Sequence, residues 1–294
     1  MTFLRALALA LLLVSCTRSA AEPVQPSAPA EEGPLAITYL GVAGWQLSSG
    51  ESTILVDPYL SRPNFDAPIV PDADAIARYA PARARLILIG HSHVDHVLDA
   101  PSIALRSGAE ILGSDSTTRF ALASGVPADH LITVKGGEDF AFGGFSVRVI
   151  PSLHAALDNK HTFGRGLTTQ PTLPMKSSEY EEGGTFIYLV RIAGRQVLVS
   201  GTANFIEREL EGLRPDIAII APGLRHEIHD YTCRLLRTLG YPPLVYPTHF
   251  DDWRAPPPAA PSLTEDVRAF AAEVAACSPQ TRLVVPRHFE PMVQ

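Results

Sequence analysis

Short apolar runs rich in β-branched residues recur along the chain from residue 36 onward. Runs of about four to eight residues, bounded by glycine, proline or polar clusters, predict strands. Between many of them the apolar positions follow helical spacing instead, which predicts helices. Strands interleaved with helices indicate α/β layers rather than an all-β sandwich or a helical bundle. The predicted strands are 36–40, 45–48, 53–56, 86–90, 110–113, 131–134, 145–150, 185–192, 196–200, 217–220, 244–246 and 283–285, and the predicted helices are 74–80, 99–107, 116–124, 206–212, 229–239 and 264–276.

Two segments show neither pattern. Residues 158–184 combine glycines, prolines and a glutamate-rich turn, and residues 255–261 are proline-rich and follow Trp253. Irregular segments of this kind in compact domains are usually functional or disordered, and proline-rich ones are stiff. We therefore expect both segments to form walls of a substrate cleft.

Residues 1–15 have the pattern of an export signal. Arg5 gives a positive start, and residues 6–14 form an apolar stretch too short to span a bilayer as a helix. The sequence LVSC at residues 13–16 resembles a bacterial lipobox, in which Cys16 becomes the lipidated first residue of the mature protein. The alternative is an ordinary signal peptide cleaved near residues 19–21. We expect an exported lipoprotein, anchored in the membrane by its N-terminal lipid and facing the periplasm or the outer surface of a bacterium.

The segment that follows the lipobox predicts a tether. Residues 17–34 are mainly Ala, Pro, Glu and Ser without apolar periodicity, so residues 16–34 are expected to comprise the lipidated cysteine and a disordered linker. A hydrophobic fraction of 46% in 294 residues is sufficient for one large core. The folded domain is therefore predicted over residues 35–294.

The net charge limits the classes of partner to expect, and the cysteine content bears on the redox state of the compartment. The formal net charge is -7 and the basic residues form no run, so nucleic acid is not an expected partner. Besides Cys16 the chain contains Cys233 and Cys277, both in predicted helices. The two could pair in an oxidising compartment. Because a domain of this size does not need a disulfide, we expect two buried free thiols.

Candidate chemistry concentrates at residues 91–96, which read HSHVDH. They directly follow residues 85–90, an apolar run closed by a glycine, so four potential metal ligands stand where a buried strand ends. In α/β proteins, active sites collect at the carboxyl ends of strands. Zinc, iron and manganese accept imidazole and carboxylate ligands, and burying so many of these groups without a metal is costly. The cluster therefore predicts a metal site.

The pattern His-x-His-x-Asp-His after a buried strand resembles the metallo-β-lactamase superfamily. Residues 38–45 (TYLGVAGW) and 53–59 (TILVDPY) are similar to the first strands and the Asp-Pro turn of one branch, which includes ascorbate-phosphate lactonases and N-acylphosphatidylethanolamine-hydrolysing phospholipases. The resemblance extends over roughly residues 36 to 290. It implies a four-layer αββα fold, with two mixed sheets packed face to face, helices outside and the site at the edge where the sheets meet.

The resemblance also implies two metal ions held side by side, most commonly zinc, with manganese and iron as alternatives. Asp57, in the Asp-Pro turn, is expected to support the histidine loop from behind. The implied ligands of the first ion are His91, His93 and His154, and those of the second ion are Asp95, His96 and His249.

The sequence departs from the family pattern at Thr202. Between the last two ligand histidines the family has a Ser-Gly-Asp type turn whose aspartate bridges the metals, whereas residues 200–204 read SGTAN. A threonine hydroxyl stays protonated near neutral pH and cannot replace a bridging carboxylate. We expect two ions with altered bridging, with a weaker second ion or a single ion as alternatives. Possible substitutes for the bridge are Thr202 itself, Asn204, Asp158 and Asp251.

The activity implied by the resemblance is hydrolysis, in which metal-activated hydroxide attacks a carbonyl or phosphoryl centre. Asp95, besides its role as a ligand, is expected to orient the hydroxide. The bond cleaved remains open among ester, lactone, amide and phosphodiester, in a small molecule or a lipid. The alternative is a metal-binding or ligand-binding lipoprotein of the same fold that has lost activity, for which Thr202 is the main argument. A nuclease is the third reading and is disfavoured by the charge.

Overall fold

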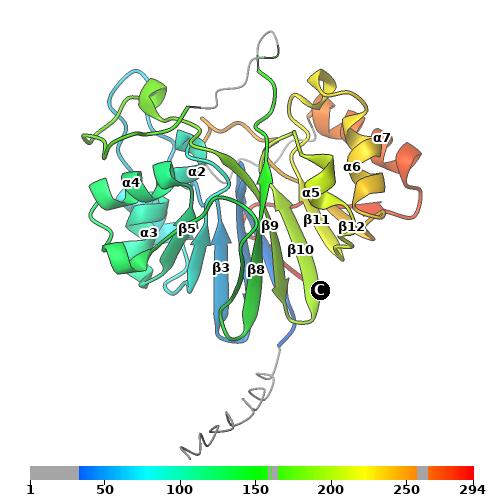
Figure 1. Ribbon diagram of the computed structural model, residues 1–294, viewed down its shortest axis with the longest axis horizontal. Coiled ribbons are helices and arrows are strands. Elements are labelled where there is room, and N and C mark those ends of the chain that lie inside the picture. Colours follow the sequence, from blue (N-terminus) through cyan, green and yellow to red (C-terminus); the bar gives the residue numbers. More distant parts are fainter. Residues whose placement is uncertain (1–32, 158–159, 161–164, 257–263) are drawn as a thin grey trace, which may run out of the picture. The chain divides into compact units, whose positions relative to one another are not determined.

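The computed structural model describes residues 33–157, 160, 165–256 and 264–294 (Figure 1). The predicted signal and all but the last two residues of the predicted tether, together with Asp158, lie outside these ranges. Among the described residues, no helix is long and apolar enough to cross a membrane.

Within the described ranges, fourteen strands form two seven-stranded sheets. In the first sheet β3 to β6 run parallel while β14, β1, β2 and β3 alternate in direction. In the second sheet β10 to β13 run parallel while β7 to β10 alternate, so both sheets are mixed. The first sheet has the order β14 (Pro291–Val293), β1 (Ala36–Gly41), β2 (Gly44–Ser49), β3 (Ser52–Val56), β4 (Leu86–Leu88), β5 (Glu110–Gly113) and β6 (Leu131–Thr133), and the second has β13 (Arg282–Leu283), β12 (Leu244–Pro247), β11 (Ile217–Ile220), β10 (Arg195–Ser200), β9 (Thr185–Ile192), β8 (Phe145–Ser152) and β7 (Asp139–Ala141).

Side chains on the central strands alternate between two buried environments. On β3, Ile54 and Val56 belong to the core between the sheets, whereas Leu55 packs toward the helices of the first sheet. On β10, Val199 points into the core between the sheets and Leu198 toward the helices of the second sheet. Burial on both faces explains why these strands are continuous apolar runs in the sequence.

Helices cover the outer face of each sheet, as Figure 1 shows. They complete the predicted four-layer αββα arrangement, which is confirmed. Apolar residues of α1 (Ala73–Tyr79), α2 (Val94–Val97), α3 (Ala100–Ser107) and α4 (Asp115–Ala123) pack with the first sheet, and those of α5 (Glu207–Leu210), α6 (Tyr231–Thr238) and α7 (Glu265–Cys277) pack with the second.

The sequence pattern missed α2, β7 and β14. All are four residues long or shorter. The two strands expose alternate residues, so they lack the apolar run by which the other strands are recognised. Short 3-10 turns also occur at Ala128–His130, Ser177–Glu179 and Arg225–Glu227. Of the three missed elements, β14 is the most important for the fold, because it places the C-terminal segment at the edge of the first sheet beside β1.

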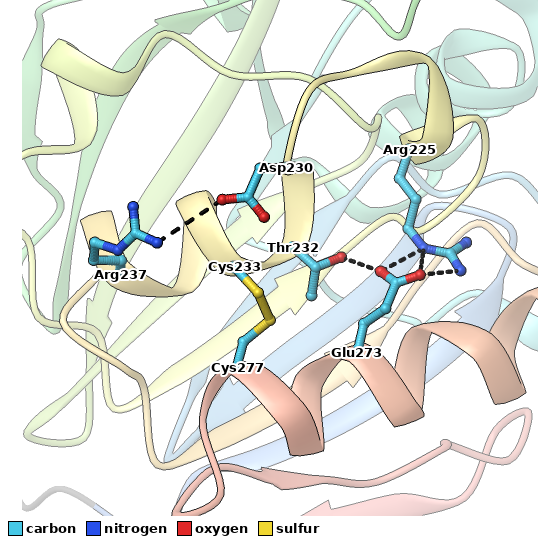
Figure 2. The surroundings of a disulfide bond; sticks show 7 residues. All are labelled: Arg225, Asp230, Thr232, Cys233, Arg237, Glu273 and Cys277. Atoms are coloured by element: carbon cyan, nitrogen blue, oxygen red, sulfur yellow. Dashed lines mark hydrogen bonds and ion pairs between the residues drawn. A yellow bond between two sulfur atoms is a disulfide. The ribbon is translucent and has the colours of Figure 1, made fainter.

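A disulfide joins Cys233 of α6 to Cys277 of α7 (Figure 2). The expectation of two free thiols is therefore wrong. Both helices bury an apolar face on the second sheet and pack side by side, which brings the two Cα atoms to 5.1 Å, within the usual range for a disulfide. Glu273 strengthens the same contact, because it accepts hydrogen bonds from Thr232 and from the guanidinium of Arg225.

Replacing both cysteines by alanine should lower the free energy of unfolding by about 4 kcal/mol, because the bond closes a loop of 44 residues in the unfolded chain. Urea unfolding of the metal-free protein, followed by circular dichroism, measures this difference. Wild-type protein unfolded in the presence of a reductant serves as the matched control and should behave like the variant. Equal midpoints for the oxidised protein and the variant would show that the bond contributes nothing.

Candidate metal centre

The predicted ligands all follow strands of the two sheets. The histidine loop 91–96 follows β4 and runs into α2, while His154 follows β8 and His249 follows β12. In the second sheet β8 and β12 run in the same direction, and the side chains that follow β4, β8 and β12 meet at one edge of the αββα sandwich. A rigid strand below each ligand fixes its position, as a metal site requires.

Six side chains form two adjacent groups. The first group is His91, His93 and His154, and the second is Asp95, His96 and His249; within each group the potential ligand atoms lie within 4.8 Å of one another. The groups touch where the rings of His91 and His96 approach to 3.8 Å between centroids. In the second group His249 Nε2 lies 3.0 Å from Asp95 Oδ2. The structure therefore brings together all the residues predicted to bind the two ions.

Asp57 holds the second group from behind. Its carboxylate is buried, accepts a hydrogen bond from His96 Nδ1 at 2.9 Å and another from the Gly90 amide at 2.6 Å. The Nε2 atom of His96 is thereby left to face the centre. A Cβ atom on Gly90 or Gly201 would lie 2.9 Å from Asp57 Oδ2, so both positions need glycine. This arrangement matches the supporting role predicted for Asp57.

Thr202 and Asn204 hold the turn that carries His154. Thr202 Oγ1 accepts a hydrogen bond from the Ala155 amide at 3.0 Å, and Asn204 Nδ2 donates to the His154 carbonyl at 3.0 Å. The Nδ1 atom of His154 donates to the Ala155 carbonyl at 2.9 Å, which leaves its Nε2 atom for the centre. Both side chains are thereby engaged with the backbone of residues 154 and 155.

No substitute for the bridging carboxylate is found among the described residues. Asp95 is the one carboxylate in the two ligand groups of that part of the chain. Asp251 is engaged elsewhere, because it accepts hydrogen bonds from the Tyr39 hydroxyl, the Val42 amide and His288 Nε2. Burial opposes ionisation of Asp251, but the bonds from His288 and Tyr39 outweigh it and keep the pKa below its usual value.

The protonation states of the first group and of Asp95 suit metal binding, whereas for His96 burial is outweighed by the carboxylates of Asp57 and Asp95, which raise its pKa. Burial, reinforced by the neighbouring imidazoles, lowers the pKa of His93 to about 4 and also lowers the pKa of His91 and His154. Burial raises the pKa of Asp95, but the adjacent imidazoles outweigh it and hold the pKa well below its usual value. Near neutral pH the three imidazoles of the first group are thus neutral and the carboxylate is charged, the forms in which they act as ligands. The donor sets fit two ions of the zinc, manganese or iron type.

A cavity of about 690 Å³ opens above the two groups. Described residues of the irregular segment 158–184 form part of its wall, as predicted, and Trp253 forms another part. Of residues 255–261, those from 257 onward lie outside the described ranges. The lining residues other than the six candidate ligands are Val94, Ala155, Leu157, Arg165, Ser177, Ser178, Tyr180, Glu181, Gly201, Thr202, Ala203, Ala221, Gly223, Leu224 and Trp253.

Sequence reasoning missed several of these wall residues. Leu224 follows β11, has a left-handed backbone with φ 62° and leaves 38% of its surface exposed. Tyr180, which lies within the predicted wall segment 158–184, follows the 3-10 turn Ser177–Glu179. Leu224 belongs to no motif. The position of Leu224 after a predicted strand was the one available signal, since residues that follow parallel strands gather at the same edge.

Comparisons with known proteins agree with this geometry. Residues 36–249 match the family described as the beta-lactamase superfamily domain. A metal-dependent hydrolase from Heliobacterium modesticaldum is 26% identical over 246 residues, which cover 80% of this chain and 88% of the relative. Another from Pelotomaculum thermopropionicum is 26% identical over 254 residues, covering 85% and 96%. Igni18, a metallo hydrolase from Ignicoccus hospitalis, has a similar fold, with a TM-score of 0.61 at 19% identity over 88% of this chain and 98% of the other.

Changing Thr202 to Asp should strengthen the binding of a second ion by at least about tenfold, because it adds a carboxylate between the two ligand groups. Metal analysis after dialysis against buffered free Zn²⁺ measures the number of ions bound at each concentration. Thr202→Ser is the matched control, since it keeps the hydroxyl that accepts from the Ala155 amide. Identical Zn²⁺ isotherms for the Asp and Ser variants would contradict the role assigned to the missing carboxylate.

Proposed function

The chain belongs to the metallo-β-lactamase superfamily and is a metal-dependent hydrolase, and we propose that it cleaves carboxylic esters or lactones that carry an apolar acyl group. The observation that carries this proposal is the apolar wall of the cavity, which stands directly above the two ligand groups.

The ions that these residues would hold supply Lewis acidity and lower the pKa of a water molecule, and we propose that both positions take zinc. The chain itself supplies orientation. Asp95, ionised and 3.0 Å from His249, is placed to accept a hydrogen bond from the attacking water and to direct it toward the substrate carbonyl. Asp57 keeps the His96 ring in the required tautomer and direction.

The charges around the cavity favour a neutral substrate over a phosphodiester. Arg165 is the one Lys or Arg side chain among the lining residues, and its side chain is 86% exposed and lies 4.0 Å from the Glu181 carboxylate. Among the lining residues that the structure describes, an anionic phosphodiester therefore finds no buried Lys or Arg side chain. An acyl chain instead finds Leu157, Leu224 and Trp253, where each buried methylene contributes about 0.8 kcal/mol.

We propose that the enzyme works outside the cytoplasm, held to the membrane of a bacterium by a lipid on Cys16. The lipobox-like sequence at residues 13–16 supports this localisation. The disulfide between Cys233 and Cys277 supports it independently, because such bonds persist in oxidising compartments such as the periplasm. A lipid or another small molecule of the envelope is then the accessible substrate.

A series of p-nitrophenyl esters tests the substrate class. The zinc-loaded enzyme should gain roughly fourfold in kcat/KM for each added methylene until the cavity is filled. Leu224→Ser should flatten that series, whereas Leu105→Ser, at an exposed position on α3, should leave it unchanged. His93→Ala should lower every rate by roughly 100-fold or more, since loss of a ligand exceeds the usual cost of losing a supporting residue.

The same assay separates the competing functions. Faster cleavage of bis-p-nitrophenyl phosphate than of any ester or lactone would overturn the proposed substrate class. If zinc-loaded protein cleaves nothing in the panel, and His93→Ala alters metal content alone, the protein is a binding protein rather than a hydrolase of these substrates.

Changing Cys16 to Ser should release the protein from the membrane, because the thiol is the proposed site of lipid attachment. Expression in a Gram-negative host, labelling with radioactive palmitate and fractionation measure the effect. Wild-type protein should carry label and pellet with membranes, while the variant should be unlabelled and soluble in the periplasm. The Cys233→Ala, Cys277→Ala double variant is the control and should be labelled like wild type. Equal labelling of the Cys16 variant would contradict the assignment.

A further inference from the structure

We propose that Asp251, together with Tyr39 and His288, is a positioning device that holds His249 in its orientation toward the second ion by fixing the backbone of Val42. The inference rests on the proposed role of His249 as a ligand, and it adds three residues that make no contact with the reacting atoms. It also gives a role at the site to the segment beyond residue 249, where the match to the family ends.

His249 has an unusual backbone conformation. Its φ is 53°, in the left-handed region that is unfavourable for a non-glycine residue, so the surrounding structure must impose it. The His249 amide donates to the Val42 carbonyl at 2.6 Å. Thr248 Oγ1 donates to the same carbonyl at 2.9 Å. The direction of the His249 side chain is therefore set by the position of the Val42 carbonyl.

Val42 is itself held in an unfavourable conformation. It lies in the turn between β1 and β2 with φ 54°, which is a rare value for a β-branched residue. Its amide donates to Asp251 Oδ1 at 2.8 Å. The segment 249–251 thus binds both polar backbone atoms of Val42, the carbonyl through the His249 amide and the amide through the Asp251 carboxylate. Loss of the Asp251 bond would release the Gly41–Val42 peptide, so the φ and ψ angles of Val42 could relax and shift the carbonyl that accepts from the His249 amide.

Two further side chains fix the Asp251 carboxylate. The Tyr39 hydroxyl donates to Oδ1 at 2.6 Å and His288 Nε2 donates to Oδ2 at 2.9 Å. The Tyr39 ring stacks on the rings of both Phe250 and His288, with centroids 5.5 and 5.0 Å away. Gly41 allows this contact, because a Cβ atom there would lie 3.2 Å from the His288 ring.

Replacing the Asp251 carboxylate by an amide would disrupt its hydrogen bonds to Tyr39, Val42 and His288. In Asp251→Asn the amide nitrogen would meet His288 Nε2–H, or would displace the Tyr39 and Val42 donors. The His288 ring could avoid the first conflict by moving its proton to Nδ1. That atom is buried and has no hydrogen-bond partner among the described residues. A proton there would be a buried donor without an acceptor, so the amide cannot reproduce all three hydrogen bonds that the carboxylate accepts.

Titration of metal-free protein with Co²⁺, followed by its visible absorption, tests the proposal. Asp251→Asn and His288→Phe should each weaken the ion bound by Asp95, His96 and His249 by about 10–100-fold and leave the ion at His91, His93 and His154 within about twofold. The phenylalanine keeps the ring that stacks on Tyr39 but removes the donor. Asp216→Asn is the matched control, because Asp216 also accepts from a backbone amide but lies at the start of β11.

Comparing the Co²⁺ affinities of the two positions across the variants distinguishes a positioning role from a purely structural one. A purely structural role would lower the melting temperature and weaken both ions alike, and equal weakening or no weakening in Asp251→Asn would overturn the proposal. His249→Ala serves as the benchmark for loss of the second ion. If His249→Ala leaves Co²⁺ binding unchanged, the ligand assignment itself is wrong and the positioning proposal is overturned with it. The readout is independent of substrate, so failure of the ester assay does not affect it.

Discussion

The buried Asp57 carboxylate is the contact on which the candidate centre depends. It lies at the end of β3 and binds the Gly90 amide after β4 and the ring of His96, while Gly201, after β10 of the other sheet, packs against it. One anion thus joins both sheets at the edge where their strands end. Because each central strand is buried on two faces, the sheets cannot slide past one another without exposing apolar surface, and the ligand spacing is fixed by the fold.

The apolar runs predicted α/β layers, and the family resemblance of residues 91–96 and 38–59 extended this to four layers and six candidate ligands, each of which follows a recognisable strand. The sequence was insufficient wherever the contact depends on a partner distant in sequence. Cys233 and Cys277 meet through the packing of two helices, and Asp251 meets His288 only because β14 returns to the first sheet. The substitution at Thr202 was visible, but its hydrogen bond to the Ala155 amide was not.

Both sheets contribute residues to the candidate centre and to the cavity above it. The histidine loop and α2, from the first sheet, contribute four of the six candidate ligands. Turns of the second sheet contribute the remaining two and much of the apolar wall, including Ala203, Ala221 and Leu224. Leu224 directly precedes Arg225, which Glu273 of α7 holds in place (Figure 2). The apolar wall of the cavity is thereby tied to the helix pair that carries the disulfide.

The second ligand group has a consequence for how the protein matures. Asp95 and His249 stand 154 positions apart, and the network behind His249 also requires the segment that ends in β14 to have paired with β1. The first group is drawn from a much shorter stretch, 91–154. Contacts between distant parts of a chain form late, because loop closure must precede them. We therefore expect the two halves of the centre to appear in sequence during folding, with the first group able to capture an ion while the second is still being assembled.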